Sequence, residues 1–176
     1  MNIHVKYELT PTQEACRLLF NDPHFNKTTP IHASDWYWLD DEKITLPELV
    51  TRIERERGVK RIYVAGPMRG IPEFNFPAFH AAATQLRSEG WSVFNPAEKD
   101  NERHGTDISK GNATGDESIA AKDHGFNLRE ALALDLEFIC KHADAIALLP
   151  GWERSQGATA EHATAVALGL EVIHLK

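Results

Sequence analysis

Two acidic residues stand where a helix would carry apolar side chains. At about 100° per residue, Leu128, Leu132 and Ile139 fall within roughly 40° of one another and define a stripe expected to be buried. Asp135 falls about 20° from Leu128, in the middle of that stripe. Burying a carboxylate without a partner is costly, so Asp135 either caps a neighbouring loop through hydrogen bonds or belongs to a chemical site.

The second acid, Glu161, lies in an alanine-rich segment, residues 156–168. Ala158, Ala165 and Leu168 share its side of the expected helix. Small residues let such a helix approach a sheet closely, which places Glu161 near the strand ends and within about two turns of the helix start, where the helix dipole favours an anion. Glu161 is then a competent nucleophile or base, the alternative being an ordinary solvated glutamate.

Two loops offer groups that bind anions such as phosphate. Gly66-Pro67-Met68-Arg69-Gly70 places an arginine on a glycine-flanked turn, and the segment 151–157 offers backbone N–H groups, the Trp152 ring and the Ser155 hydroxyl. Neither loop matches a Walker loop or the dinucleotide fingerprint. The nine histidines include no HExxH or facial-triad spacing, so neither a metal nor a cofactor is expected.

The elements that must position these groups alternate from Lys60 onward. The pattern predicts strands at 61–65, 91–94, 143–149 and 170–175, and helices at 77–88, 128–142 and 156–168. This alternation predicts an α/β domain over residues 59–176, with a Rossmann-like (flavodoxin-like) parallel sheet flanked by helices. Ligands bind beyond the carboxyl ends of such strands, which makes three loops candidates: 66–75, 95–100 and 150–157.

Residues 1–58 differ from this pattern and are assigned as an N-terminal accessory segment, a small helical appendage. Thr10-Pro11-Thr12-Gln13 and Thr45-Leu46-Pro47-Glu48 resemble capping boxes and predict short helices near 11–20 and 46–57. The aromatic cluster 36–38 is expected to pack this segment onto its host domain rather than bind a ligand. The polar stretch 95–127 predicts a long structureless connection, either a mobile loop or lid at about 96–127 or an insertion.

Composition narrows the class of partner. The 176 residues carry a net charge of −7, which disfavours nucleic-acid polymers and anionic membranes, so a small molecule is the expected ligand. No apolar run approaches the roughly 20 residues that span a bilayer, and residues 1–9 lack a hydrophobic signal core. Together with two distant cysteines, Cys16 and Cys140, this predicts a cytoplasmic protein.

Three blocks of the chain resemble the nucleoside 2-deoxyribosyltransferase-like superfamily, which includes nucleoside-monophosphate N-glycosidases. They are Tyr63-Val64-Ala65-Gly66-Pro67, Asp135 with Ala143-Asp144, and Gly157-Ala158-Thr159-Ala160-Glu161. The similarity covers about residues 60–176. The blocks 66–70, 75–79, 95–98 and 148–152 resemble still more closely a subgroup of often phage-borne members.

The resemblance implies a role for each matched position. Glu161 would attack C1′ of the sugar and form a covalent glycosyl-enzyme, Asp135 would orient or protonate the leaving base, and Tyr63 would position the nucleophile. The implied substrate-binding residues on the first turn are Gly66, Pro67, Arg69, Gly70 and Asn75, and those on the later loop are Trp152, Ser155 and Gly157. Relatives form dimers or higher homo-oligomers, so self-association is expected.

Ser155 favours a nucleoside 5′-monophosphate over a free nucleoside. It stands where transferases of free nucleosides carry an Asp, and where the monophosphate branch carries a Ser that binds phosphate together with an Arg equivalent to Arg69. Pro67 replaces a Ser of that branch, which removes one phosphate donor. The alternatives are a non-catalytic nucleotide-binding or sequestering protein and a structural interaction protein, and the latter explains neither Asp135 nor Glu161.

Overall fold

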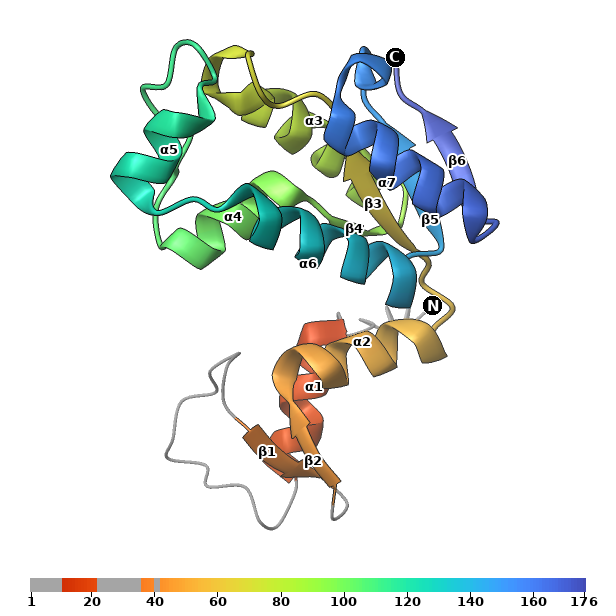
Figure 1. Ribbon diagram of the computed structural model, residues 1–176. Coiled ribbons are helices and arrows are strands. Elements are labelled where there is room, and N and C mark those ends of the chain that lie inside the picture. Colours follow the sequence, from red (N-terminus) through yellow and green to blue (C-terminus); the bar gives the residue numbers. More distant parts are fainter. Residues whose placement is uncertain (1–10, 22–35, 40–41) are drawn as a thin grey trace, which may run out of the picture. The chain divides into compact units, whose positions relative to one another are not determined.

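The computed structural model describes residues 11–21, 36–39 and 42–176, which fall into two compact units, Met1–Val59 and Lys60–Lys176 (Figure 1). The first unit contains α1 (Pro11–Asn21), β1 (Trp36–Leu39), β2 (Glu42–Thr45) and α2 (Leu46–Glu56). Both predicted helices are present. The capping box of α2 is formed by Thr45 and Glu48, whereas Thr10 of the other predicted box lies outside the described residues.

The sequence did not predict the antiparallel hairpin that β1 and β2 form in the first unit. Tyr37, from the aromatic cluster, is buried in this unit's own core together with Ile44, Leu49 and Ile53. Trp36, in contrast, is 56% exposed. The alternation of a strand places these two neighbouring rings on opposite faces.

The second unit is built on a parallel sheet in the order β4-β3-β5-β6. Its strands are β3 (Arg61–Ala65), β4 (Ser92–Phe94), β5 (Ala145–Leu148) and β6 (Glu171–His174). All four strands lie within the predicted ranges. The predicted Rossmann-like α/β fold is therefore confirmed.

Helices cover both faces of this sheet. Alternate residues of β3 point to opposite faces, and all five residues of the strand are buried. Ile62 and Val64 join one core with residues of α3 (Phe76–Ser88), and Tyr63 joins another with residues of α6 (Leu128–Lys141) and α7 (Gln156–Ala167). Tyr63 therefore lies on the face that α6 and α7 cover. Short 3-10 turns precede α3 and α7, namely η1 (Pro72–Asn75) and η2 (Trp152–Arg154).

The strand order creates a switch point beside β3. From β3 the chain crosses to β4 on one side and later returns to β5 on the other side. The loops that follow β3 and β5 therefore diverge at the carboxyl edge of the sheet, where open α/β folds bind ligands.

The prediction of a structureless connection at 95–127 is wrong. This stretch contains α4 (Pro96–His104) and α5 (Glu117–His124). Between them the buried Asn112 accepts a hydrogen bond from the Asp116 N–H and donates one to the Asp116 carbonyl, and its own carbonyl accepts from the Glu73 N–H. These bonds give the backbone groups of Glu73 and Asp116 partners, so this segment is ordered although its sequence has no hydrophobic periodicity.

In the part of the chain that the structure describes, no helix is long and apolar enough to cross a membrane.

Candidate active site

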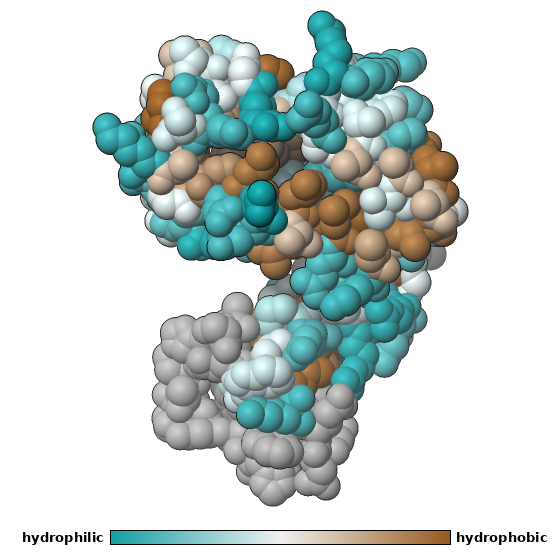
Figure 2. Space-filling model, in the orientation of Figure 1, coloured by the Kyte–Doolittle hydropathy of each residue, from teal (hydrophilic) through white to brown (hydrophobic). Residues whose placement is uncertain are grey.

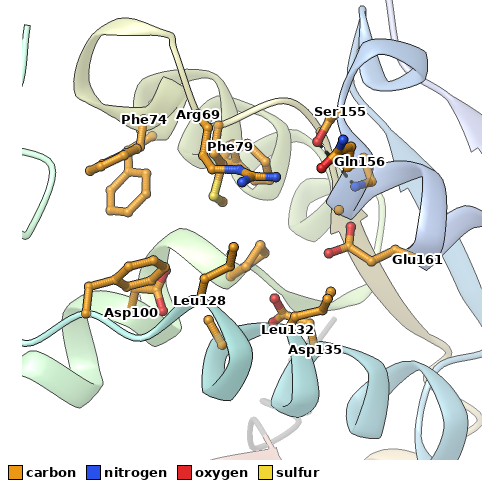
Figure 3. A pocket seen from close by; sticks show the side chains of 18 of the residues that line it. Arg69, Phe74, Phe79, Asp100, Leu128, Leu132, Asp135, Ser155, Gln156 and Glu161 are labelled. Atoms are coloured by element: carbon orange, nitrogen blue, oxygen red, sulfur yellow. Dashed lines mark hydrogen bonds between the residues drawn. The ribbon is translucent and has the colours of Figure 1, made fainter. Parts of the chain in front are cut away.

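A cavity of about 250 Å³ opens where the second unit's surface is hollowed, at the carboxyl end of β3 (Figures 2 and 3). Its walls come from β3, the loop after it, α3, α4, α6 and α7. Apolar and aromatic side chains form most of the lining. Five acidic or hydroxyl groups interrupt it: Tyr63, Asp100, Asp135, Ser155 and Glu161.

Tyr63 and Glu161 are joined at the bottom of this cavity. Tyr63, in the middle of β3, is 1% exposed, and its hydroxyl donates a hydrogen bond to Glu161 Oε1 over 3.0 Å. Glu161 on α7 is 7% exposed, so the alternative of a solvated glutamate is wrong. The α7 helix can lie close to the sheet because Ala158 and Ala165, on the same side, are buried against it.

Asp135 reaches the same cavity from α6. This helix begins at Asn127, whose side chain accepts hydrogen bonds from the N–H groups of Arg129 and Glu130. Asp135 is partly buried and lines the cavity. Within the described residues no hydrogen bond joins it to a neighbouring loop, so it does not act as a loop cap.

The predicted stripe of α6 is correct in direction but wrong in burial. Ile139 is buried in the core, whereas Leu128 is 39% exposed and Leu132 is partly buried. Leu128, Leu132 and Asp135 all line the cavity (Figure 3). The first half of the apolar stripe therefore faces the cavity instead of the core, which is why it tolerates an acid.

Burial and the charge of a neighbouring carboxylate raise the pKa values of Asp135 and Glu161. Burial raises the pKa of Glu161, and the nearby Asp135 raises it further, while the hydrogen bond from Tyr63 lowers it. Burial likewise raises the pKa of Asp135, to which the charge of Asp100 contributes. The pKa of the Tyr63 phenol is raised by its burial and by both carboxylates. Near neutral pH this cluster therefore carries fewer charges than it has carboxyls.

Sequence reasoning marked the loop 95–100 but missed Asp100 as a site residue. Asp100 lies on α4, which begins at the buried Asn95 with a side-chain cap to the Ala97 N–H. Asp100 is 6% exposed and lines the cavity, and burial raises its pKa to about 6.

Arg69 and Ser155, the residues predicted to bind phosphate, lie across the cavity from the α6 residues Leu132 and Asp135 (Figure 3). Arg69, Ser155 and Gly157 line the cavity, and Arg69 and Ser155 also line a second cavity of about 830 Å³. Arg69 pairs with Glu117 over 3.4 Å, and the Ser155 hydroxyl caps α7 by accepting from the Ala158 N–H.

The other predicted binding residues take different places. Gly66 lines the first cavity, and a Cβ there would lie 2.8 Å from Leu149. Pro67 and Gly70 line the second cavity. Asn75 and Trp152 line neither of these two cavities. The Asn75 amide donates to the Pro67 carbonyl over 3.0 Å and so links the two ends of the loop 67–75. The Trp152 ring packs against His162, 4.3 Å away.

Residues 60–174 match the model of one protein family, which is described as a domain of unknown function, DUF4406. The chain belongs to this family. The match spans almost the whole second unit and therefore includes every cavity residue named above. Comparison with curated proteins finds no match, and comparison with solved structures finds none.

In residues 11–21, 36–39 and 42–176, no group of three or more His, Cys, Asp or Glu side chains is arranged to hold a metal ion.

Proposed function

We propose that this protein cleaves the N-glycosidic bond of a (deoxy)nucleoside 5′-monophosphate through a covalent glycosyl-Glu161 intermediate, as an N-glycosidase or a deoxyribosyltransferase. One observation carries the proposal. A buried glutamate is held by a tyrosine hydroxyl at 3.0 Å, and a second acid that raises its pKa lines the same cavity. The resemblance to nucleoside 2-deoxyribosyltransferase-like proteins supports the same roles for Tyr63, Asp135 and Glu161.

The reaction divides the work between the two acids. With the proton on Asp135, Glu161 is ionised, and the hydrogen bond from Tyr63 favours that form. A Glu161 oxygen then bonds to C1′ while the C1′–N bond breaks. The electron pair of the C1′–N bond passes to the base nitrogen, which takes the proton of Asp135.

The second step releases the sugar. Water or a second base attacks C1′ from the vacated face, Asp135 accepts the proton of this nucleophile, and the ester oxygen of Glu161 departs as a carboxylate. The site thereby returns to its starting protonation state.

A phosphate fits the rim formed by Arg69 and Ser155. Arg69 is a half-exposed cation and Ser155 a hydroxyl, and no acid lies at position 155 to repel an anion. The ion pair between Glu117 and Arg69 is long, at 3.4 Å, and exposed, so it is weak. A phosphate can therefore displace Glu117 from Arg69.

The test is base release from a panel of ribo- and deoxyribonucleoside 5′-monophosphates, followed by HPLC of the free base. We expect release by the native protein, none by Glu161→Ala, and an adduct on Glu161 in mass spectrometry of the quenched reaction. Full activity of Glu161→Ala would refute the assignment.

A second candidate is a nucleotide-binding protein without turnover. The raised pKa of Glu161 favours it, because a nucleophile that holds its proton near neutral pH does not attack. Thermal shifts with nucleotides but no product over hours would establish this candidate over the first.

A further inference from the structure

Asp100 is a buried acid whose capacity to accept hydrogen bonds is unused. Its side chain is 9% exposed, yet no hydrogen bond to its carboxylate is found among the described residues. Arg103 forms an ion pair with it, with Nη1 3.6 Å from Oδ1, beyond hydrogen-bond length. A buried carboxylate in this state costs stability unless something else donates to it.

Aromatic and aliphatic side chains line the same cavity as Asp100. Phe74, Phe79, Phe126 and Ile108 line it from the other elements. Phe74 and Asp100 lie at one end, while Glu161 and Ser155 lie at the other (Figure 3). The end near Asp100 thus combines flat apolar walls with one acceptor group, which suits a planar heterocycle.

Part of this cavity wall has a strained backbone conformation. Glu73, Phe74 and Asn75 have φ of 53°, 50° and 59°, a left-handed run that non-glycine residues rarely adopt. The Glu73 N–H donates to the Asn112 carbonyl over 2.8 Å and so helps to fix the run. The result is that Phe74, 5% exposed, lines the cavity.

The placement of a nucleotide follows from the groups at the end of the cavity opposite Asp100, and here the inference rests on the proposed function. C1′ must meet Glu161, and the phosphate must meet Arg69 and Ser155. The base then extends from C1′ into the remaining space, between the phenylalanines and toward Asp100.

We infer that Asp100 selects guanine, by accepting one hydrogen bond from the ring N1–H and one from the 2-amino group. An ionised carboxylate offers two acceptor oxygens and no donor. Guanine is the common base that presents two adjacent donors on one edge. Adenine and cytosine place an acceptor beside their amino group, and thymine and uracil flank one N–H with two carbonyls. Each of these bases would leave an Asp100 oxygen unpaired or facing another acceptor.

The protonation state of Asp100 agrees with this pairing. Burial raises its pKa to about 6, while Arg103 and His104 lower it, so the carboxylate is ionised at pH 8. Two hydrogen bonds from guanine would stabilise the ionised form further.

Binding to the Glu161→Gln variant tests the inference without turnover. By calorimetry at pH 8 we expect dGMP to bind roughly 10- to 100-fold more tightly than its 2′-deoxyinosine analogue, which lacks only the 2-amino group. dAMP and dCMP should bind about 100-fold more weakly than dGMP or worse. These comparisons change only the ligand, so they need no folded Asp100 variant.

Adding Asp100→Asn should remove the preference for dGMP, because an amide offers one acceptor and a clashing donor. The matched control is Asp123→Asn, which removes an exposed acid from α5 and should retain the preference. Equal binding of dGMP and the inosine nucleotide would overturn the inference. So would an equal loss for every base in Asp100→Asn, since that pattern belongs to an acid that acts only on the charge of Asp135.

Failure of the proposed function is a separate result. Selective binding of dGMP with no base release by the native protein would refute the glycosidase and leave the role of Asp100 standing. Base release without preference among the bases would do the reverse.

Discussion

The two ends of the cavity treat a buried carboxyl in opposite ways. Glu161 and Asp100 are 7% and 6% exposed, and burial raises the pKa of both. Glu161 is met by the hydroxyl of Tyr63, on the neighbouring strand β3, at 3.0 Å. Asp100 has no hydrogen-bond partner within the described residues.

This difference separates a reacting group from a recognising one. A carboxyl that the protein already orients stays in one geometry while bonds change around it, which favours catalysis. A carboxyl left open gains its donors only from a ligand, which favours selection among ligands. The predictions below test this contrast in order of effect.

Glu161→Gln gives the largest effect. We expect kcat for base release to fall by about 10⁴-fold or more, because an amide cannot form the glycosyl ester. Glu153→Gln is the matched control, since Glu153 is an exposed glutamate on η2, just before α7, and its loss should leave kcat unchanged. A modest fall in Glu161→Gln would remove the contrast with Asp100.

Asp135→Asn tests the proton donor. We expect roughly a 10²- to 10⁴-fold fall in kcat with a natural base, because general acid catalysis to the departing nitrogen is lost. A deoxyribosyl 5′-phosphate with a leaving group that needs no proton should be affected far less. Equal losses with both substrates would mean that Asp135 does not donate the proton.

Tyr63→Phe removes the partner that distinguishes Glu161 from Asp100. The hydrogen bond lowers the pKa of Glu161, so its loss raises that pKa and moves the acidic limb of the pH profile of kcat/KM to higher pH. We expect about a 10- to 100-fold fall in kcat near neutral pH. An unshifted limb would show that Tyr63 does not act on the ionisation of Glu161.

Two of the three cavity carboxylates could be found in the sequence because each differs in polarity from the residues around it. Asp135 interrupts an apolar stripe and Glu161 an alanine-rich helix, so each acid stands out from its neighbours. Asp100 lies in Pro-Ala-Glu-Lys-Asp-Asn-Glu-Arg-His, where one acid among many charges gives no such signal. Only the packing of α4 against the cavity distinguishes it.

The fold was predictable where periodicity dominates. The parallel sheet can be predicted from two features: the short apolar runs of β3 and β5, and the helices between strands that end at a glycine. The stretch after β4 was not predictable, because α4 and α5 are polar helices and Asn112 orders the turn between them through side-chain hydrogen bonds. Such bonds leave no repeating pattern in the sequence.

The smallest expected effect is on stability, and it separates the two acids by pH. A carboxyl whose pKa is raised by folding binds more protons in the folded state, so its contribution to stability is lost as pH rises through the folded pKa. For Asp100 that loss is complete a little above its pKa of about 6, whereas for Glu161 it continues to a pKa of about 8. Glu161→Gln should therefore raise the Tm relative to the native protein by a few degrees at pH 8 and by little at pH 5.

For Asp100→Asn the gain in Tm should level off above about pH 7, because Asp100 is by then fully ionised in both states. Scanning calorimetry of both variants and the native protein between pH 5 and 8 measures the two curves. Identical curves would show that the two acids share one electrostatic environment, and a Tm below that of native protein at pH 8 for Glu161→Gln would show that its buried charge is stabilising. Either result would contradict the division of the cavity into a reacting end and a recognising end.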